Sequence, residues 1–247
     1  GCFYLDGVTN ATLYNVTVTD SRCTTQGCWG GAMVPEGNSN LLIENSAFIG
    51  CEAPQGYGGA IDDGTEANWV VINTRFERNV ATYGGAVYNF GTTVSRFIGC
   101  QFIDNKADNN GGAIKPSSNT RVYVDGCLFQ GNTGSSNGAV GPASDCSASG
   151  ETYCVVIKNS IFRNNGATSV GGALAIASPT WLENVVFDSN WSTDQAGGLY
   201  IYLQLATYLS NLTFINNTAP NGAGIFIEGQ VDVEFLGPTS FYNNTGK

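Results

Sequence analysis

Two adjacent carboxylates, Asp62 and Asp63, are the side chains of this sequence best suited to chemistry, and they directly follow the segment Gly58-Gly59-Ala60-Ile61. Two or three carboxylates on one face can act as the acid and base of a glycoside hydrolase, or bind calcium beside a Lys or Arg. Neighbouring repeats place Glu36 and Lys115 at comparable positions, which predicts a patch of four charged side chains. The alternative interpretation is a solvated turn that carries ordinary surface charge.

The composition narrows the chemistry that such a patch could support. The chain has 247 residues, 20 Asp and Glu, 10 Lys and Arg, and no histidine, so its formal net charge is −10. Without histidine there is no Ser-His-Asp triad, no Cys-His pair and no histidine-ligated metal, and a site of the polygalacturonase type is incomplete. An acidic chain also lacks the basic patch that binds nucleic acid or anionic lipid. We therefore expect no enzymatic activity and no nucleic-acid partner.

The elements that position these residues are repeats. An aromatic residue followed three positions later by Asn recurs at intervals of 25 to 33 residues, in units that begin at Phe76, Phe102, Phe129, Phe162, Phe187, Phe214 and Phe241, with degenerate units at Phe48 and Val18. A glycine-rich motif of the form Gly-Gly-Ala-apolar follows each aromatic but the last, in units that begin at Gly30, Gly58, Gly84, Gly111, Asn137, Gly171, Gly197 and Gly222.

These repeats predict an all-β fold, a single right-handed parallel β-helix of eight to nine coils with about 27 residues per coil. The units are rich in Gly, Asn, Thr and β-branched residues, which favour strands and corners over helices. Equivalent residues of successive coils would lie about 4.8 Å apart. The Phe side chains would then form an internal column and the Asn side chains a ladder of amide hydrogen bonds. The glycine pair would make a tight corner.

The paired motif resembles the repeats of the chlamydial polymorphic outer-membrane proteins, and similar repeats occur in extracellular proteins of algae and other protists. The resemblance covers residues 1–244. It implies a right-handed β-helix displayed at a cell surface, in adhesion or in surface structure. It does not imply an enzyme active site.

Eight cysteines indicate an oxidising compartment and disulfide bonds. The repeat register predicts that Cys100 stacks on and pairs with Cys127, and that Cys23 does the same with Cys51. Cys146 and Cys154 would close a small insertion near residues 145–154. Cys2 and Cys28 remain and would pair by default, with Cys23–Cys28 as the competing local bridge.

Six Asn residues stand in the acceptor sequence Asn-x-Ser/Thr: Asn10, Asn15, Asn190, Asn211, Asn216 and Asn243. Asn190 occupies the ladder position, so its amide should be buried and unmodified. Asn216 and Asn243 precede the ladder position and should face solvent. We expect N-linked glycans at several of these acceptors, and none at Asn190.

Residues 1–247 are interpreted as one β-helix domain, a segment of a longer protein. We expect a non-catalytic extracellular glycoprotein that acts at the cell surface as a structural, adhesive or filament-forming module. Its partners would be other copies or flanking domains that contact the open ends of the helix, and surface glycans or proteins. No run of 18 apolar residues is present to span a membrane in this segment.

The sequence is also compatible with two alternative functions. The first is a carbohydrate-active enzyme, a polysaccharide lyase or glycosidase on the same fold. The second is a glycan-binding module in which surface aromatic side chains stack on sugar rings, the candidates being Trp29, Tyr57, Tyr83, Trp191, Tyr200 and Tyr202. We expect no cofactor other than calcium, for which Asp62 and Asp63 are the candidate ligands.

Overall fold

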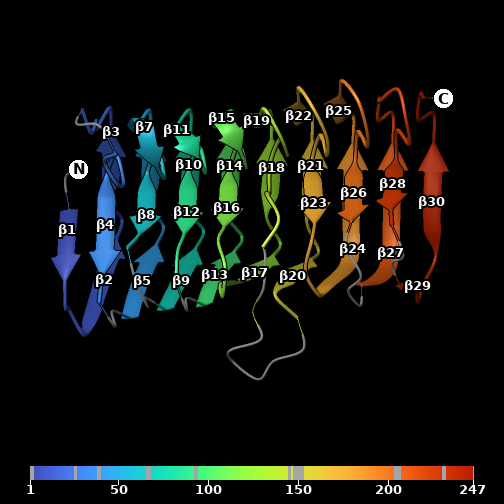
Figure 1. The fold of residues 1–247 in the computed structure, drawn as a ribbon. Helices are drawn as coiled ribbons and strands as arrows, with labels where there is room; N and C mark the ends of the chain where they lie inside the picture. Colours follow the sequence, from blue (N-terminus) through green and yellow to red (C-terminus); the bar gives the residue numbers. More distant parts are fainter. Residues whose placement is uncertain are drawn as a thin grey trace.

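The computed structural model describes residues 3–24, 27–37, 40–64, 68–91, 94–143, 146, 153–202, 207–229 and 232–246. These residues form parallel strands, and no helix occurs among them. Figure 1 shows the chain as a row of similar coils that leads from the N-terminus to the C-terminus. The fold is a parallel β-solenoid of about eight turns with about 27 residues per turn, which confirms the predicted fold class.

The first face of the solenoid is built from the strands that follow the glycine-rich motifs. A five-stranded sheet contains β1 (Phe3–Asp6), β4 (Met33–Glu36), β8 (Ile61–Asp63), β12 (Val87–Asn89) and β16 (Ile114–Pro116). A three-stranded sheet contains β23 (Leu174–Ile176), β26 (Leu199–Tyr202) and β28 (Ile225–Glu228). Val140 connects the two sheets through single bridges to Ile114 and Leu174.

A sixteen-stranded sheet contains two series of strands. One series is β2 (Asn10–Tyr14), β5 (Asn40–Glu44), β9 (Asn68–Ile72), β13 (Val94–Ile98), β17 (Arg121–Asp125), β20 (Val155–Lys158) and β29 (Val233–Phe235). The other is β3 (Thr17–Thr19), β6 (Ala47–Ile49), β10 (Arg75–Glu77), β14 (Gln101–Ile103), β18 (Leu128–Gln130), β21 (Ile161–Arg163) and β30 (Thr239–Tyr242). The longer strands β24 (Thr180–Asp188) and β27 (Thr207–Ile215) pair with both series and join them.

The third face is a six-stranded sheet of β7 (Glu52–Tyr57), β11 (Val80–Tyr83), β15 (Lys106–Asn110), β19 (Thr133–Gly134), β22 (Gly166–Ala167) and β25 (Trp191–Ser192). The glycine pair lies between this sheet and the first face, and its two members have different tasks. Gly58 adopts a φ of +61°, which glycine tolerates best. A Cβ on Gly59 would lie 2.1 Å from the carbonyl oxygen of Gly85 in the next coil, so only glycine fits.

The core contains the predicted column of Phe rings. Ring centroids of successive coils are 4.6 to 5.3 Å apart from Phe48 to Phe241, and most pairs are within 10° of parallel. The rings from Phe48 to Phe214 are fully buried. Burial of each ring contributes roughly 2–3 kcal/mol, so the column accounts for a large part of the apolar stabilisation.

The predicted Asn ladder runs beside the Phe column. Asn105 Nδ2 donates to Asn132 Oδ1 in the next coil at 2.9 Å and to the carbonyl oxygen of Phe76 in the preceding coil at 3.0 Å. The same arrangement repeats from Asn79 to Asn244. Each amide therefore links three coils, which fixes the register of the stack.

Candidate functional site

A pocket of about 360 Å³ opens beside β4, β8 and β12 and is the strongest candidate for a functional site. We call it the acidic pocket and define it by its lining residues: Trp29, Glu36, Tyr57, Asp62, Asp63, Gly64, Tyr88 and Phe90. Its size is typical of a small-molecule site. The lining contains three acidic residues, four aromatic residues and no Lys or Arg.

The pocket exists because Gly64 interrupts a line of larger side chains. The Gly64 amide donates to the carbonyl oxygen of Pro35 at 3.1 Å, which places Gly64 next to Glu36. A Cβ built on Gly64 would lie 3.3 Å from Cγ of Glu36. Phe90 follows β12 in the next coil. The missing side chain at Gly64 therefore leaves space between Glu36 and Phe90.

Aromatic side chains form the walls of the acidic pocket. The ring centroids of Tyr57 and Tyr88 are 4.7 Å apart, and those of Tyr88 and Phe90 are 6.5 Å apart. Trp29 pairs with Tyr57 through a backbone bridge, which places it at the same edge. Trp29 and Phe90 are about half exposed, at 49% and 47%, so their faces are open to a ligand.

Asp62 is the most unusual group in the acidic pocket. Its side chain is buried, with 3% exposure, and within the described part of the chain its carboxyl group has no hydrogen-bond or ion-pair partner. Burial raises the pKa of Asp62 to about 8, because the charged form is poorly solvated there. The carboxyl group is therefore mostly protonated at neutral pH.

The structure brings together three of the four charged residues that the sequence predicted as a patch. Glu36, Asp62 and Asp63 all line the acidic pocket. Lys115 does not, and that part of the prediction is wrong, because Tyr88 stands between Asp62 and Lys115 in the strand register. Lys115 Nζ instead donates to the carbonyl oxygens of Pro116 and Pro142 at 2.6 and 2.8 Å, and burial lowers its pKa to about 8.

A second concavity, of about 470 Å³, lies on the outer face of β13, β17, β20 and β24. We call it the aromatic groove; it includes Arg96, Tyr123, Tyr153, Lys158 and Trp181. Arg96 lies over the ring of Tyr123 at 5.0 Å, and Lys158 over the ring of Trp181 at 5.5 Å. The sequence analysis missed these residues, although four of them occupy alternate strand positions that point outward; the fifth, Tyr153, precedes β20.

The predicted surface aromatics differ in their accessibility. Tyr83 stacks on Tyr57 at 5.5 Å and extends the wall of the acidic pocket. Trp191 covers Gly166 and is 39% exposed. Tyr200 is buried, donates a hydrogen bond to Glu228 and stacks on Tyr202 at 5.1 Å. Its side chain serves packing, and burial raises its pKa.

Cys100 and Cys127 stack in adjacent coils as predicted, but the structure contains them as thiols, so the predicted disulfide is wrong. Each sulfur lies 3.5 Å from the carbonyl oxygen two residues earlier, that of Ile98 or Asp125. Equivalent hydroxyl groups make the same contact, as Ser160 does with Lys158 at 2.6 Å. The thiols thus occupy a column of side-chain hydrogen bonds and take the place of Ser or Thr.

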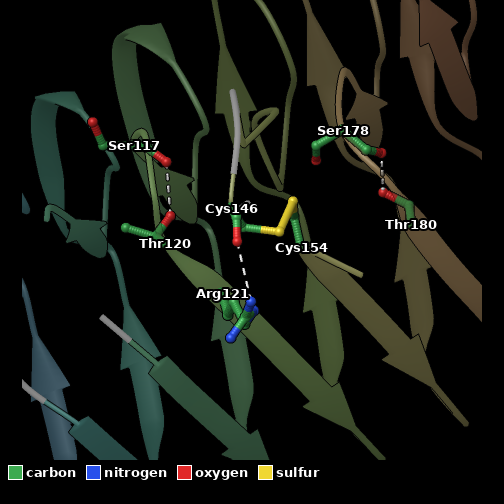
Figure 2. The surroundings of a disulfide bond; sticks show 7 residues. All are labelled: Ser117, Thr120, Arg121, Cys146, Cys154, Ser178 and Thr180. Atoms are coloured by element: carbon green, nitrogen blue, oxygen red, sulfur yellow. Dashed lines mark hydrogen bonds between the residues drawn. A yellow bond between two sulfur atoms is a disulfide. The ribbon is translucent and has the colours of Figure 1, made fainter. Parts of the chain in front are cut away.

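The other cysteines confirm one pairing and correct two. Figure 2 shows the bond between Cys146 and Cys154, beside a hydrogen bond of 3.1 Å from Arg121 to the carbonyl oxygen of Cys146. Cys23 is joined to Cys28, the competing local bridge, which overturns the Cys23–Cys51 and Cys2–Cys28 pairings. Cys2 itself lies outside the described residues.

The reason for this correction is the strand register. The bridge between Arg22 and Glu52 places Cys51 opposite Ser21, two residues before Cys23. Counting back from the glycine pair misplaced Cys23, because the segment closed by the Cys23–Cys28 bond lies between them. The amide of Cys51 donates to Asn79 Oδ1 at 2.9 Å, so Cys51 belongs to the column of the Asn ladder.

The acceptor asparagines fall into two groups. Asn190 is fully buried, and its Nδ2 donates to Phe162 and Asn217 at 3.0 Å, as its ladder position predicted. The other five are exposed, and four of them occupy corners with φ between 50° and 55°: Asn15, Asn211, Asn216 and Asn243. Asn10 begins β2. Whether glycans are attached stays a prediction.

Within the described ranges there is no group of three or more Cys, Asp or Glu side chains placed to hold a metal ion. Asp62 and Asp63 are consecutive residues of β8, so their side chains project to opposite faces of the strand. The described part of the chain has no helix that is long and apolar enough to cross a membrane.

The fold and the repeated motifs define a parallel β-solenoid of the repeat-protein class. The model of the Chlamydia polymorphic membrane protein repeat matches residues 99–115 and 211–228. Both matches contain a Phe-x-x-Asn unit and the glycine-rich motif that follows it. The chain therefore carries repeats of this type, as the sequence analysis predicted.

Two curated proteins are similar to parts of the chain. The metabotropic glutamate receptor-like protein R of Dictyostelium discoideum is 30% identical over 156 residues, which is 61% of this chain and 9% of that protein. The probable autotransporter YfaL of Escherichia coli strain K12 is 29% identical over 147 residues, which is 52% of this chain and 12% of that protein. The chain thus spans about a tenth of the length of these relatives. No solved structure matches.

Proposed function

We propose that this chain is a stiff, non-catalytic module of a cell-surface glycoprotein that takes part in adhesion or in the assembly of surface structure. The observation that carries the proposal is the unbroken Phe column with the Asn ladder beside it, because together they hold the side faces of the rod at a constant spacing. The repeat match and the similarity to a probable autotransporter support display at a surface. Partners of this module would be surface glycans, proteins or other copies.

The test of surface display uses antibodies raised against the folded chain. Intact cells of the source organism should be labelled without permeabilisation. Labelling that requires permeabilised cells would contradict the location. Adhesion is tested separately, with beads that carry the chain and are held against host or sister cells under flow. Retention no greater than that of albumin-coated beads would contradict an adhesive role.

A second candidate function is glycan binding in the aromatic groove. Aromatic rings such as Tyr123 and Trp181 stack on sugar rings, and Arg96 and Lys158 could pair with the carboxylates of acidic sugars. A glycan array that includes acidic and neutral polysaccharides tests this function. Trp181→Ala should abolish any signal that comes from the groove, whereas Trp191→Ala, at a different face, should not.

The non-catalytic part of the proposal has its own test. The chain is incubated with the same polysaccharides, with and without calcium, and reducing ends or unsaturated products are measured. We expect no turnover. Turnover that Asp62→Asn abolishes would replace the proposal with a carbohydrate-active enzyme.

A further inference from the structure

The acidic pocket contains a carboxyl group that the fold does not require. Asp62 occupies an outward position of β8. Its equivalent in the preceding coil is Val34, because Met33 is the register partner of Ile61. A small apolar residue is therefore sufficient for stacking here. A buried carboxyl group without a partner is unfavourable, so its presence points to a ligand that supplies the partner.

The surroundings of Asp62 select the chemistry of that ligand. Glu36 adds a second carboxyl group, and no basic side chain lines the pocket. The faces of aromatic rings are negative and attract cations. A ligand that fits both features has a positive charge for the carboxylates and an apolar body for the rings.

We propose that the acidic pocket binds an organic ammonium ion, primary or quaternary, whose charge pairs with Asp62 and whose carbon groups pack against Tyr57 and Tyr88. Trp29 and Phe90 stand at the open side and would cover the bound group. The assignment goes beyond the proposed function, since it concerns a small-molecule site and stands whether or not the rod is adhesive.

Two other ligand classes fit less well. A metal ion requires several convergent oxygens, whereas Asp62 and Asp63 project to opposite faces of β8. A neutral sugar would donate hydroxyl hydrogen bonds to the carboxyl groups, but it brings no positive charge to a lining that has acidic side chains and no basic one.

Binding of an ammonium ion should depend on pH. The other titratable residues that line the pocket are Glu36 from β4, Tyr57 from the end of β7 and Tyr88 from β12. The neighbouring Asp63 also belongs to the lining, and its side chain projects to the other face of β8. Burial raises the pKa of Tyr88, so this tyrosine stays neutral in the range of interest. Because the pKa of Asp62 is about 8, a cation of constant charge should bind more tightly as pH rises toward 8, by up to about tenfold per unit.

The experiment compares choline with 3,3-dimethylbutan-1-ol, its neutral isostere, by titration calorimetry at about pH 8.5 and low salt. Choline should bind at least about tenfold more tightly than the alcohol, and n-butylamine should also bind. Asp62→Asn should weaken choline binding about tenfold or more and remove the pH dependence. Gly64→Leu, which fills the pocket, should abolish binding.

The matched control is Asp108→Asn, which removes an exposed carboxylate near Lys106 on another face and should change choline affinity less than about twofold. Thermal unfolding checks that each variant is folded. If Gly64→Leu does not fold, Asp62→Asn still tests the proposal, because it changes the pocket without adding bulk. The proposal is overturned if choline and n-butylamine both fail to bind, if the alcohol binds equally well, or if Asp62→Asn has no effect. Saturable binding of glucose or N-acetylglucosamine with no preference for choline would likewise overturn it in favour of a neutral sugar.

Discussion

At the scale of single residues, the Asn ladder shows how one side chain can fix the register of a whole stack. Asn132 Oδ1 accepts from the backbone amide and from Nδ2 of Asn105, and its own Nδ2 donates to Phe102 in the preceding coil and to Asn165 in the next. All four groups are buried, so no water can replace a lost partner. The ladder position therefore tolerates asparagine much better than a residue of similar size.

Asn132→Ala should lower the free energy of unfolding by roughly 2–4 kcal/mol, because it removes the acceptor of the Asn105 backbone amide, one of the two acceptors of Asn105 Nδ2 and a donor to the Phe102 carbonyl. Denaturant unfolding followed by circular dichroism measures the change. Asn109→Ala is the control, since Asn109 donates to Tyr83 at the surface and its loss should cost less than about 1 kcal/mol. Equal losses for the two variants would argue against a buried ladder.

Asp62 should make stability depend on pH in an unusual direction. Its pKa is about 8 in the folded chain and about 4 in the unfolded chain, so between these values the folded state holds one more proton. The free energy of unfolding should therefore fall as pH rises from 4 to 8, by up to about 1.4 kcal/mol per unit, and this contribution should be flat above 8.

Asp62→Asn should remove this slope and make the chain more stable than the parent near pH 8. Unfolding midpoints in urea at a series of pH values measure both effects. The two chains should converge near pH 4, where Asp62 is protonated in the folded and, increasingly, in the unfolded state. Parallel profiles across the whole range would contradict the raised pKa.

At the scale of elements, the corner between the third sheet and the first face is set by the close approach of two backbones. Gly59 has no room for a Cβ because the carbonyl oxygen of Gly85 would lie 2.1 Å away. Backbone atoms on both sides are held by strand pairing, so the contact cannot relax by moving a flexible side chain. The second glycine of the motif is thus required by stacking rather than by its own dihedral angles.

Gly59→Ala should lower the free energy of unfolding by at least about 3 kcal/mol or prevent folding. Gly64→Ala is the control, since its Cβ would meet the flexible side chain of Glu36 at 3.3 Å, and it should cost less than about 1 kcal/mol. Thermal unfolding and expression yield compare the two. A tolerated alanine at Gly59 would mean that the coils are not stacked as closely as the register requires.

The thiol column makes a separate prediction for the cysteines. Because Cys100 and Cys127 make the hydrogen bonds that Ser160 makes in the same column, the double variant Cys100→Ser, Cys127→Ser should stay within about 1.5 kcal/mol of the parent. Alkylation of non-reduced, unfolded protein should label both thiols, whereas Cys146 and Cys154 should be labelled only after the protein has been reduced. Failure to label Cys100 and Cys127 would restore the disulfide that the sequence predicted.

Features that recur in every coil could be predicted from the sequence, whereas features that occur once could be predicted only in part. The Phe column and the Asn ladder were predictable because the same contact recurs in every coil and requires the same residue type at the same position of each repeat. The cysteine pairings were not predictable, for two reasons. Two cysteines stacked in adjacent coils resemble a disulfide pair in the sequence even where they replace Ser or Thr in a column of hydrogen bonds. The segment closed by the Cys23–Cys28 bond also changes the number of residues between Cys23 and the glycine pair. The acidic pocket was predictable in part, since Asp62 stood out but the space above Gly64 and the position of Tyr88 needed the register.

At the scale of the whole molecule, the acceptor asparagines lie where the fold turns. Asn216 and Asn243 directly follow the register partners Ile215 and Tyr242, so they share one edge of the rod in successive coils. Asn15 and Asn211 lie at the corner between the two series of the sixteen-stranded sheet. Glycans at these positions would cover edges and leave the acidic pocket and the aromatic groove accessible.

Chains secreted by a eukaryotic host should carry glycans at several of these exposed acceptors and none at Asn190. A glycan at Asn190 would prevent the hydrogen bonds of its Nδ2 to Phe162 and Asn217, so chains modified there should not fold. Glycopeptide mass spectrometry measures the occupancy, and Ser192→Ala, which removes the acceptor sequence and keeps the Asn190 amide, serves as the control that should leave the total glycan mass unchanged. Substantial occupancy at Asn190 in folded protein would contradict the register.

The sameness of successive coils has a consequence for how such a chain can change over generations. Each residue of a column contacts the same residue type in the next coil, so an in-frame gain or loss of one repeat recreates equivalent contacts between coils. Recombination between the repeats of the gene can therefore change the length of the rod without unfolding it. The acidic pocket does not tolerate such a change. It is assembled from unlike residues of consecutive coils, so the same exchange that is harmless to the scaffold would erase the site, and selection on length and selection on ligand binding must act on different stretches of one repetitive gene.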